Sequence, residues 1–356
     1  MLEIYKSVKE LLKLDRVCID NTIFRLHYKA TVIILITCSL FATSNQYIGN
    51  PIDCITENVP SHAMNSYCWI YGTYTVPERL NGVIGRDIIQ PGVGSRDGAS
   101  EIKFHKYYQW VCFVLFFQAI LFYMPRFLWK SWEENRIKML VHNLNSLVVP
   151  EDNKEERKKI IINYFKLNMG HHNGYMAKFF FCEVLNFINI ISQLYFMDYF
   201  LDGEFSTYGF EVLKFTSLEP EIRVDPMARV FPKVAKCTFS SYGPSGSLQN
   251  FDSLYILPLN IINEKIYVFL WYWFIILTIL TTISLVLEAF ILSCSLVRKM
   301  MLKSRLRCTR LHNVVKLLAE CKVGDWFILY LLSLNIDAVV FEEIIADMSA
   351  SIESAV

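Results

Sequence analysis

The sequence predicts an all-α membrane protein whose chain crosses the bilayer four times. Four long stretches are nearly free of charged side chains, and aromatic residues border the second of them. The composition agrees, because 53% of the 356 residues are hydrophobic, only 19% are charged, and the mean hydropathy is +0.31. A typical soluble domain is about a quarter charged.

The clearest span lies within Tyr107 to Trp132, YYQWVCFVLFFQAILFYMPRFLWKSW. The 19 residues from Tyr107 to Pro125 carry no charge, and about 20 apolar residues of helix cross the hydrocarbon core of a bilayer. Tyrosine and tryptophan at both ends are typical of the two membrane interfaces, and a buried helix of a soluble protein does not require them. Because proline lacks a backbone donor, we expect Pro125 to kink this helix.

Three further segments have the length and polarity of spans. Residues 30–52 and 266–287 are uncharged, and residues 179–197 contain only Glu183. The last span reaches residue 297 if Glu288 is tolerated near the interface. Since an ionised side chain is costly inside the bilayer, we expect Glu183 and Glu288 to extend their carboxylates to the cytoplasmic interface.

Basic residues near the span ends predict the orientation. Arg25 and Lys29 precede the first span, and none follows it closely. Residues 246–264, before the fourth span, also contain none. Basic residues are frequent after the second and fourth spans: Arg126, Lys130, Arg136, Lys138, Arg298, Lys299, Lys303, Arg305, Arg307 and Arg310. Cytoplasmic segments carry the excess of basic residues, so both termini are predicted to be cytoplasmic and two loops to face outward.

Cysteine usage fits this orientation. Of ten cysteines, only Cys54, Cys68 and Cys237 fall in the predicted outward loops, where disulfides persist. Three is an odd number, so at least one of them has no partner within the subunit. That cysteine is either a free thiol or the site of an intermolecular bond.

The N-terminal segment, three histidines and a short apolar segment near the C-terminus each have a simple structural interpretation. Residues 1–22 alternate apolar and basic side chains and predict an amphipathic helix, either on the membrane surface or inside a pore. His171 and His172 lie between glycines in a predicted solvated loop and lack further metal ligands. His105 faces outward in this topology, where it could sense external pH. Residues 326–334 are too few to span a bilayer and predict helices that pack in a cytoplasmic dome.

No pattern favours an enzyme, a metal site or a cofactor, because we find no histidine cluster, acidic pair or glycine-rich phosphate loop. The net charge of +1 gives no field that would recruit nucleic acid.

Several motifs resemble one family. YYQWV, at Tyr107, Tyr108, Gln109, Trp110 and Val111, is similar to the signature of innexins, the invertebrate gap-junction proteins. The resemblance extends through most of the chain: QYIGNPIDC at 46–54, YCWIYGTYTVP at 67–77, FPKVAKCTFSSYGPSGSLQ at 231–249, LPLNIINEKIYVFLWYWF at 257–274 and VGDWFILYLL at 323–332.

The resemblance implies a subunit of an oligomeric pore. Innexins form octameric rings in the plasma membrane, and a ring docks onto one in an adjacent cell to make a gap junction. Ions and small solutes then pass by diffusion. Membrane lipid and other innexins are the expected partners. The N-terminal helix would narrow the pore, with Met1, Leu2, Glu3 and Tyr5 as pore-lining residues.

The expected segments are a pore-mouth helix, four transmembrane helices, two disulfide-linked extracellular loops, a cytoplasmic loop and a helical cytoplasmic tail. In chain order they are 1–22 (pore-mouth helix), 23–48 (first span), 49–106 (first extracellular loop), 107–130 (second span), 131–176 (cytoplasmic loop), 177–201 (third span), 202–264 (second extracellular loop), 265–291 (fourth span) and 292–356 (tail).

The sequence departs from the family at one cysteine. Innexins usually have two cysteines in each outer loop, and these bond between the loops. The resemblance therefore implies a Cys68–Cys237 bond, whereas Cys54 would face Tyr255 and stay unpaired. Loss of a native disulfide costs about 2–5 kcal/mol, so we expect impaired docking. A duplicated or virus-carried copy, such as the vinnexins of ichnoviruses, would fit this departure.

Other four-span classes fit less well. Connexins carry three cysteines in each outer loop, and the loop signatures of tetraspanins and claudins are missing. Two alternatives within the family stay open: an undocked hemichannel, and a modulatory subunit that joins rings of other innexins.

Overall fold

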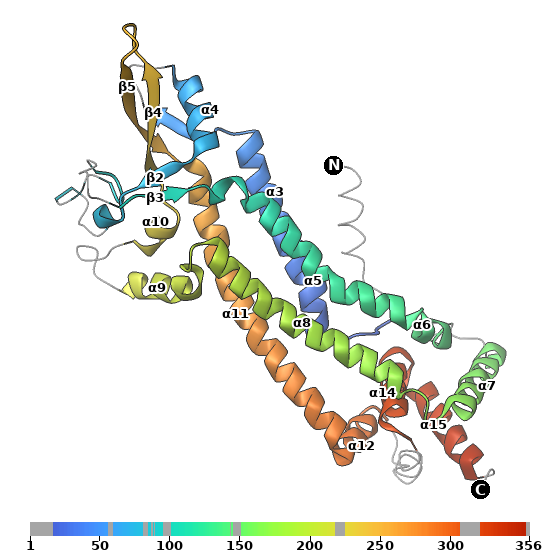
Figure 1. Cartoon of the computed structure of the whole chain (residues 1–356). Coiled ribbons are helices and arrows are strands. Elements are labelled where there is room, and N and C mark those ends of the chain that lie inside the picture. The colour runs from blue at the N-terminus through green and yellow to red at the C-terminus, as the bar shows by residue number, and fades with distance from the viewer. Residues whose placement is uncertain are drawn as a thin grey trace. The chain divides into compact units, whose positions relative to one another are not determined.

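The computed structural model describes residues 17–55, 60–80, 85, 86, 88, 90–94, 101–142, 144, 151–217, 225–306 and 321–353 (Figure 1). The described part is mostly helical. The predicted pore-mouth helix, apart from residues 17–22, and its four predicted pore-lining residues lie outside the described residues.

Four helices among the described residues are long and apolar enough to cross a membrane, which confirms the predicted number of spans. The first covers Thr22–Tyr47 and consists of α2 (Thr22–Arg25), the π-helical segment η1 (Leu26–Thr31) and α3 (Val32–Tyr47). The others are α5 (Val111–Glu133), α8 (Asn173–Phe200) and α11 (Pro258–Ser293).

Two helix boundaries differ from the expected ones. Helix α5 begins at Val111 because Tyr107–Gln109 forms a separate 3-10 turn, η3. Helix α11 begins at Pro258, seven residues before the expected start at residue 265. Proline suits the first helical position, since the donor it lacks would be unpaired there in any case. Pro125 lies inside α5, and the kink stays a prediction.

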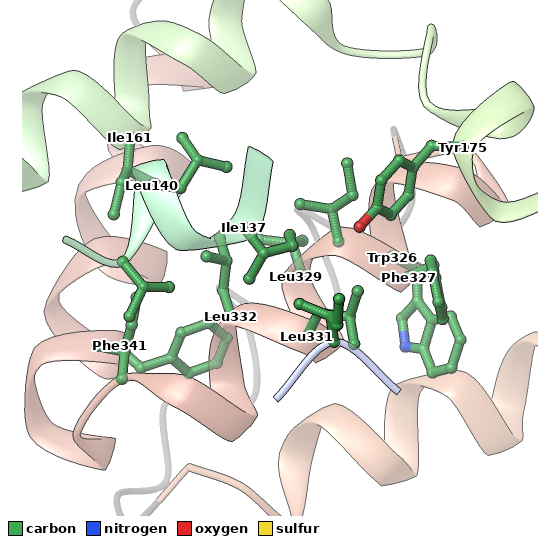
Figure 2. Packing of buried hydrophobic residues seen from close by; sticks show 14 of the residues in the cluster. Ile137, Leu140, Ile161, Tyr175, Trp326, Phe327, Leu329, Leu331, Leu332 and Phe341 are labelled. Carbon is green, nitrogen blue, oxygen red and sulfur yellow. The ribbon is translucent and has the colours of Figure 1, made fainter. Parts of the chain in front are cut away.

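The chain forms two compact units. One contains the described parts of residues 1–31, 121–189 and 278–356. Besides span segments it has α6 (Arg136–Leu140), α7 (Glu151–Asn168), α12 (Ser295–Lys303), α14 (Val323–Asn335) and α15 (Ala338–Glu353). Figure 2 shows its core, where α14 contributes Leu329, Leu331 and Leu332. The predicted packing of short C-terminal helices is thus present.

The second unit covers the described parts of residues 32–120 and 190–277, and it contains a five-stranded antiparallel sheet that the sequence analysis did not predict. We call it the loop sheet. Its strands are β1 (Asp53–Ile55), β2 (Thr73–Thr75), β3 (Lys103–His105), β4 (Val234–Tyr242) and β5 (Leu248–Ile256). Short helices accompany them: α4 (Ser61–Tyr71), η2 (Pro77–Arg79), α9 (Phe205–Ser217) and α10 (Pro226–Val230).

The strand order interleaves the two loops. It runs β1-β5-β4-β2-β3, so the β4–β5 hairpin of the second loop lies between strands of the first loop (Figure 1). The hairpin is in register from Val234↔Ile256 to Tyr242↔Leu248. Its turn includes Gly246 at φ +78°, a backbone angle that glycine adopts without steric cost. Neither loop can complete this sheet without the other.

Substituting Leu332 by alanine tests the core around α14. Leu332 is fully buried, so Leu332→Ala should lower the free energy of unfolding by about 2–5 kcal/mol. The melting temperature of the purified protein in detergent measures this. Val339→Ala is the control, because Val339 is 47% exposed. Equal effects of the two substitutions would contradict the assignment of α14 to the core.

Candidate functional site

The turn η3 attaches both loops to the start of α5. Tyr107 Oη donates a hydrogen bond to the carbonyl of Val230 in the second loop (3.2 Å). Gln109 Nε2 donates to the carbonyl of Trp69 in the first loop. Tyr108 is buried, with its ring centroid 5.1 Å from that of Trp69. The first three residues of the signature therefore hold the two loops at one span end.

The last two signature residues have opposite environments. Val111 is buried as the first residue of α5. Trp110 is 59% exposed, and its ring centroid lies 6.1 Å from that of Phe113. An exposed tryptophan at the end of an apolar helix suits a membrane interface.

A disulfide joins Cys68 of α4 to Cys237 of β4, with a Cα–Cα distance of 6.1 Å. Both residues are buried in a small apolar cluster. The bond closes 169 residues of chain and links the two loops covalently. It is the same pair that the family resemblance implies.

Cys54 lies directly opposite Tyr255 in the pairing of β1 with β5. Its thiol is free and half-buried. Tyr255 is fully buried in the cluster that also contains Ile52, Met64 and Leu257. Burial, and then the neighbouring Cys54 thiol, raise the pKa of Tyr255 well above its ordinary value. A neutral phenol therefore occupies the position opposite the Cys54 thiol.

His105 is buried in the loop sheet and does not suit a sensor of external pH. Its Nε2 lies 2.8 Å from Thr75 Oγ1 on the adjacent strand. Burial, and then the charge of Lys103, lower the pKa of His105 from 6.5 to about 4. The side chain is consequently neutral throughout the physiological range.

Residues 18–21, which we call the anchor, hold the beginning of the first span. The buried carboxylate of Asp20 accepts hydrogen bonds from Arg126 Nη1 (2.8 Å), Arg25 Nε (2.6 Å) and Tyr28 Oη (3.1 Å). Since a buried charge is stable only when it is paired, these three donors fix the position of Asp20.

Backbone atoms of the anchor are held as well. Trp129 Nε1 of α5 donates to the carbonyl of Ile19 (3.1 Å). Asn335, at the end of α14, accepts from the amide of Cys18 (2.5 Å) and donates to its carbonyl (2.7 Å). The Asn335 side-chain amide bonds both the N–H and the C=O of Cys18, so it holds the backbone there as a neighbouring β-strand would. The periodicity of the sequence does not predict such a contact.

Asn21 connects the anchor to the third and fourth spans. Its Oδ1 accepts from the amide of Phe24 and caps α2 (2.7 Å). Its Nδ2 donates to Glu183 of α8 and to Glu288 of α11. The expectation that Glu183 extends to the interface is wrong, because its side chain is buried and held by Asn21. Glu288 is partly exposed and shares the same amide.

His172 is likewise buried rather than solvated. Its Nδ1 lies 2.6 Å from Asp325 Oδ1, and its Nε2 lies 2.9 Å from Tyr164 Oη. Burial raises the pKa of Asp325, but hydrogen bonds from His172 and from the amides of Lys322 and Gly170 outweigh this and leave it below 3.8. His171 is exposed, as expected. Among the described residues, no group of three or more His, Cys, Asp or Glu side chains could hold a metal ion.

These features define a class: a membrane protein with four apolar helices and two disulfide-linked loops. The innexin family model matches residues 20–352. Innexin inx2 of Drosophila melanogaster is 60% identical over 98% of this chain and 95% of its own length. Innexin inx2 of Schistocerca americana is 58% identical over 99% of both chains, and innexin shaking-B of Drosophila melanogaster is 44% identical over 98% and 94%.

The chain therefore belongs to the innexin family. Innexins are structural components of gap-junction channels, and this is the role of the chain. As members of a channel family, they assemble into oligomers and are not enzymes.

Acidification should destabilise the loop sheet through His105. Because its folded pKa is lowered, stability is complete above the unfolded value of 6.5 and is lost as pH falls towards about 4. The loss reaches roughly 3 kcal/mol. Melting temperatures from neutral pH down to about pH 4 measure it. His105→Gln should remove most of the dependence, and an unchanged pH profile in this variant would disprove the assignment.

Asp20→Asn should lower the free energy of unfolding by about 3–5 kcal/mol, because it removes the buried charge that pairs with Arg25 and Arg126. Thermal unfolding in detergent gives the difference. Asp202→Asn is the matched control, since Asp202 is 70% exposed and 3.8 Å from Lys103, and such surface pairs contribute under about 1 kcal/mol. A smaller effect at Asp20 than at Asp202 would refute the role of the anchor.

Proposed function

We propose that eight copies of this chain form a ring around one pore in the plasma membrane, with both termini in the cytoplasm. The ring docks onto a ring of an adjacent cell, and ions and small solutes diffuse through the joined pores. Innexin relatives over nearly the whole chain support the assembly of a channel. The excess of basic residues after α5 and α11 supports the cytoplasmic position of the termini.

The observation that carries the docking proposal is the interleaved loop sheet. The β4–β5 hairpin has a neighbouring strand on each side and is bonded to α4 through Cys237. Little conformational entropy is then lost when it meets a partner. Its end exposes Tyr242 (80%) and Leu248 (64%). Large exposed apolar side chains on a rigid element suit a surface that is covered in the assembly.

The proposed role of the N-terminal segment rests on the anchor. Met1, Leu2, Glu3 and Tyr5 line the narrow part of the pore in this proposal. A segment that precedes the first span can take one position in the ring only if its end is fixed. Asp20 and Asn21 supply that fixed end through hydrogen bonds to the first, second, third and fourth spans.

Tyr255 favours a second candidate, a ring that functions undocked or as a modulatory partner of other innexins. The thiol of Cys54 faces a phenol instead of a second thiol, so one link between the loops is missing. A less constrained loop sheet would dock less well. Membrane lipid and other innexins are the partners in both candidates.

Tyr255→Cys decides between the two candidates. Residues directly opposite in an antiparallel pair have Cα atoms about 4.5–5.5 Å apart, which lies within the range that a disulfide spans. We expect Cys54 to form a disulfide with the introduced thiol, and the variant to raise the conductance between paired cells that express it. Tyr255→Ser, which removes the phenol without adding a thiol, is the matched control.

Strong coupling by the unaltered chain would show that docking does not require a second disulfide between the loops. This result would rule out the undocked candidate. Coupling by Tyr255→Cys alone would favour the undocked or modulatory role. Dye uptake by single cells then measures the undocked channel, and co-expression with another innexin tests modulation. If no version couples cells or admits dye, and co-expression with another innexin changes neither readout, the channel proposal for this chain is wrong.

A further inference from the structure

A cavity of about 320 Å³ opens beside the anchor, entirely within the unit that contains α14. Most of its wall is apolar or aromatic and comes from three helices, with Phe179 and Phe180 from α8, Ile291 from α11, and Leu331 and Leu334 from α14. Its volume falls in the range of small-molecule sites, about 300–1,000 Å³. The wall suits an aliphatic chain.

The polar side of the cavity contains charges of both signs. Asp20 is already paired with Arg25 and with Arg126. Glu288 accepts from the amide of Asn21. Arg305 is exposed, and no acidic side chain of the described chain pairs with it. The cation that remains for a ligand is therefore Arg305.

Helix α12 and its surroundings add to this positive charge. Arg298, Lys299 and Lys303 follow α11 directly, and residues 289–306 contain no aspartate or glutamate. Basic clusters next to the cytoplasmic end of a span attract anionic lipid headgroups, and basic pockets between spans bind them. The basic cluster and the apolar cavity occur together at the end of α11.

We propose that this cavity binds an anionic amphiphile, with an acyl chain among the α8, α11 and α14 side chains and the anionic head at Arg305. The inference rests on the proposed topology, which puts α12 on the cytoplasmic side. The source is either an anionic membrane lipid or a free fatty acid, since both present the same chemistry. Cys18 and Asn21 of the anchor also line the cavity, so its occupancy bears on the N-terminal segment.

Photolabelling of the purified full-length protein in phosphatidylcholine vesicles tests the proposal. Three probes carry the same photoreactive acyl chain: a free fatty acid, a phosphatidylserine and a phosphatidylcholine. Peptides from α8, α11 and α14 should be labelled by one or both anionic probes several times more than by the neutral one. The more efficient anionic probe identifies the source.

Two variants, each with a matched control variant, locate the label. Leu334→Trp fills the cavity and should abolish labelling, whereas Leu296→Trp, at a position that is 67% exposed on α12, should not. Arg305→Gln removes a charged hydrogen-bond partner and should weaken labelling by the anionic probes about tenfold. Lys138→Gln, on an exposed position of α6, is the charge control.

Three results would overturn the proposal: equal labelling by the neutral probe, full labelling of Leu334→Trp, or labelling that appears only after residues 2–16 are removed. The last result would mean that the N-terminal segment of the chain occupies the cavity. The assay requires neither docking nor conductance. A chain that fails to couple cells can still bind the probe, so this inference and the proposed function fail separately.

Discussion

A buried carboxylate must be paired, and Asp20 meets this requirement with two arginines and a tyrosine. The pairing determines where the first span begins and how it joins the second, because Arg126 belongs to α5. Asn21 connects Glu183 and Glu288 in a similar way, since its side-chain amide donates hydrogen bonds to carboxyl groups of the third and fourth spans. In a low-dielectric environment it is costly to break such hydrogen bonds, so residues 18–21 have few alternative conformations. These contacts hold the chain in place at residues 18–21, directly before the first span.

A related constraint shapes the loops, because backbone N–H and C=O groups that are removed from water need hydrogen-bond partners. Three of the five strands are only three residues long and could not form a stable sheet alone. The β4–β5 hairpin supplies their neighbours, and the Cys68–Cys237 bond holds the assembly together. The loop sheet is therefore a joint product of two segments that are distant in sequence.

Sequence patterns predicted the spans well because their signal is local: about twenty apolar residues satisfy their own backbone as a helix wherever they lie. The loop sheet was missed for two reasons. Three of its strands are only three residues long and show too little alternation to be distinguished from turns. The nine-residue strands β4 and β5 pair with strands of the other loop, and a single sequence does not reveal such pairing. Glu183, His105 and His172 were placed in water because a single sequence does not reveal a partner far along the chain. Their partners or neighbours, among them Asn21, Thr75 and Asp325, come from other segments.

The sequence by itself determined four spans, their expected orientation and the family, since hydropathy, charge and long motifs are properties of contiguous residues. The tertiary structure alone decided the interleaving of the loops, the position of Cys54 opposite Tyr255 in register, and the anchor of residues 18–21. The cavity beside the anchor belongs to the same group, because its wall comes from segments more than 300 residues apart, such as Cys18 and Leu334. Burial, register and enclosed volume depend on which distant segments meet, and only the fold brings them together.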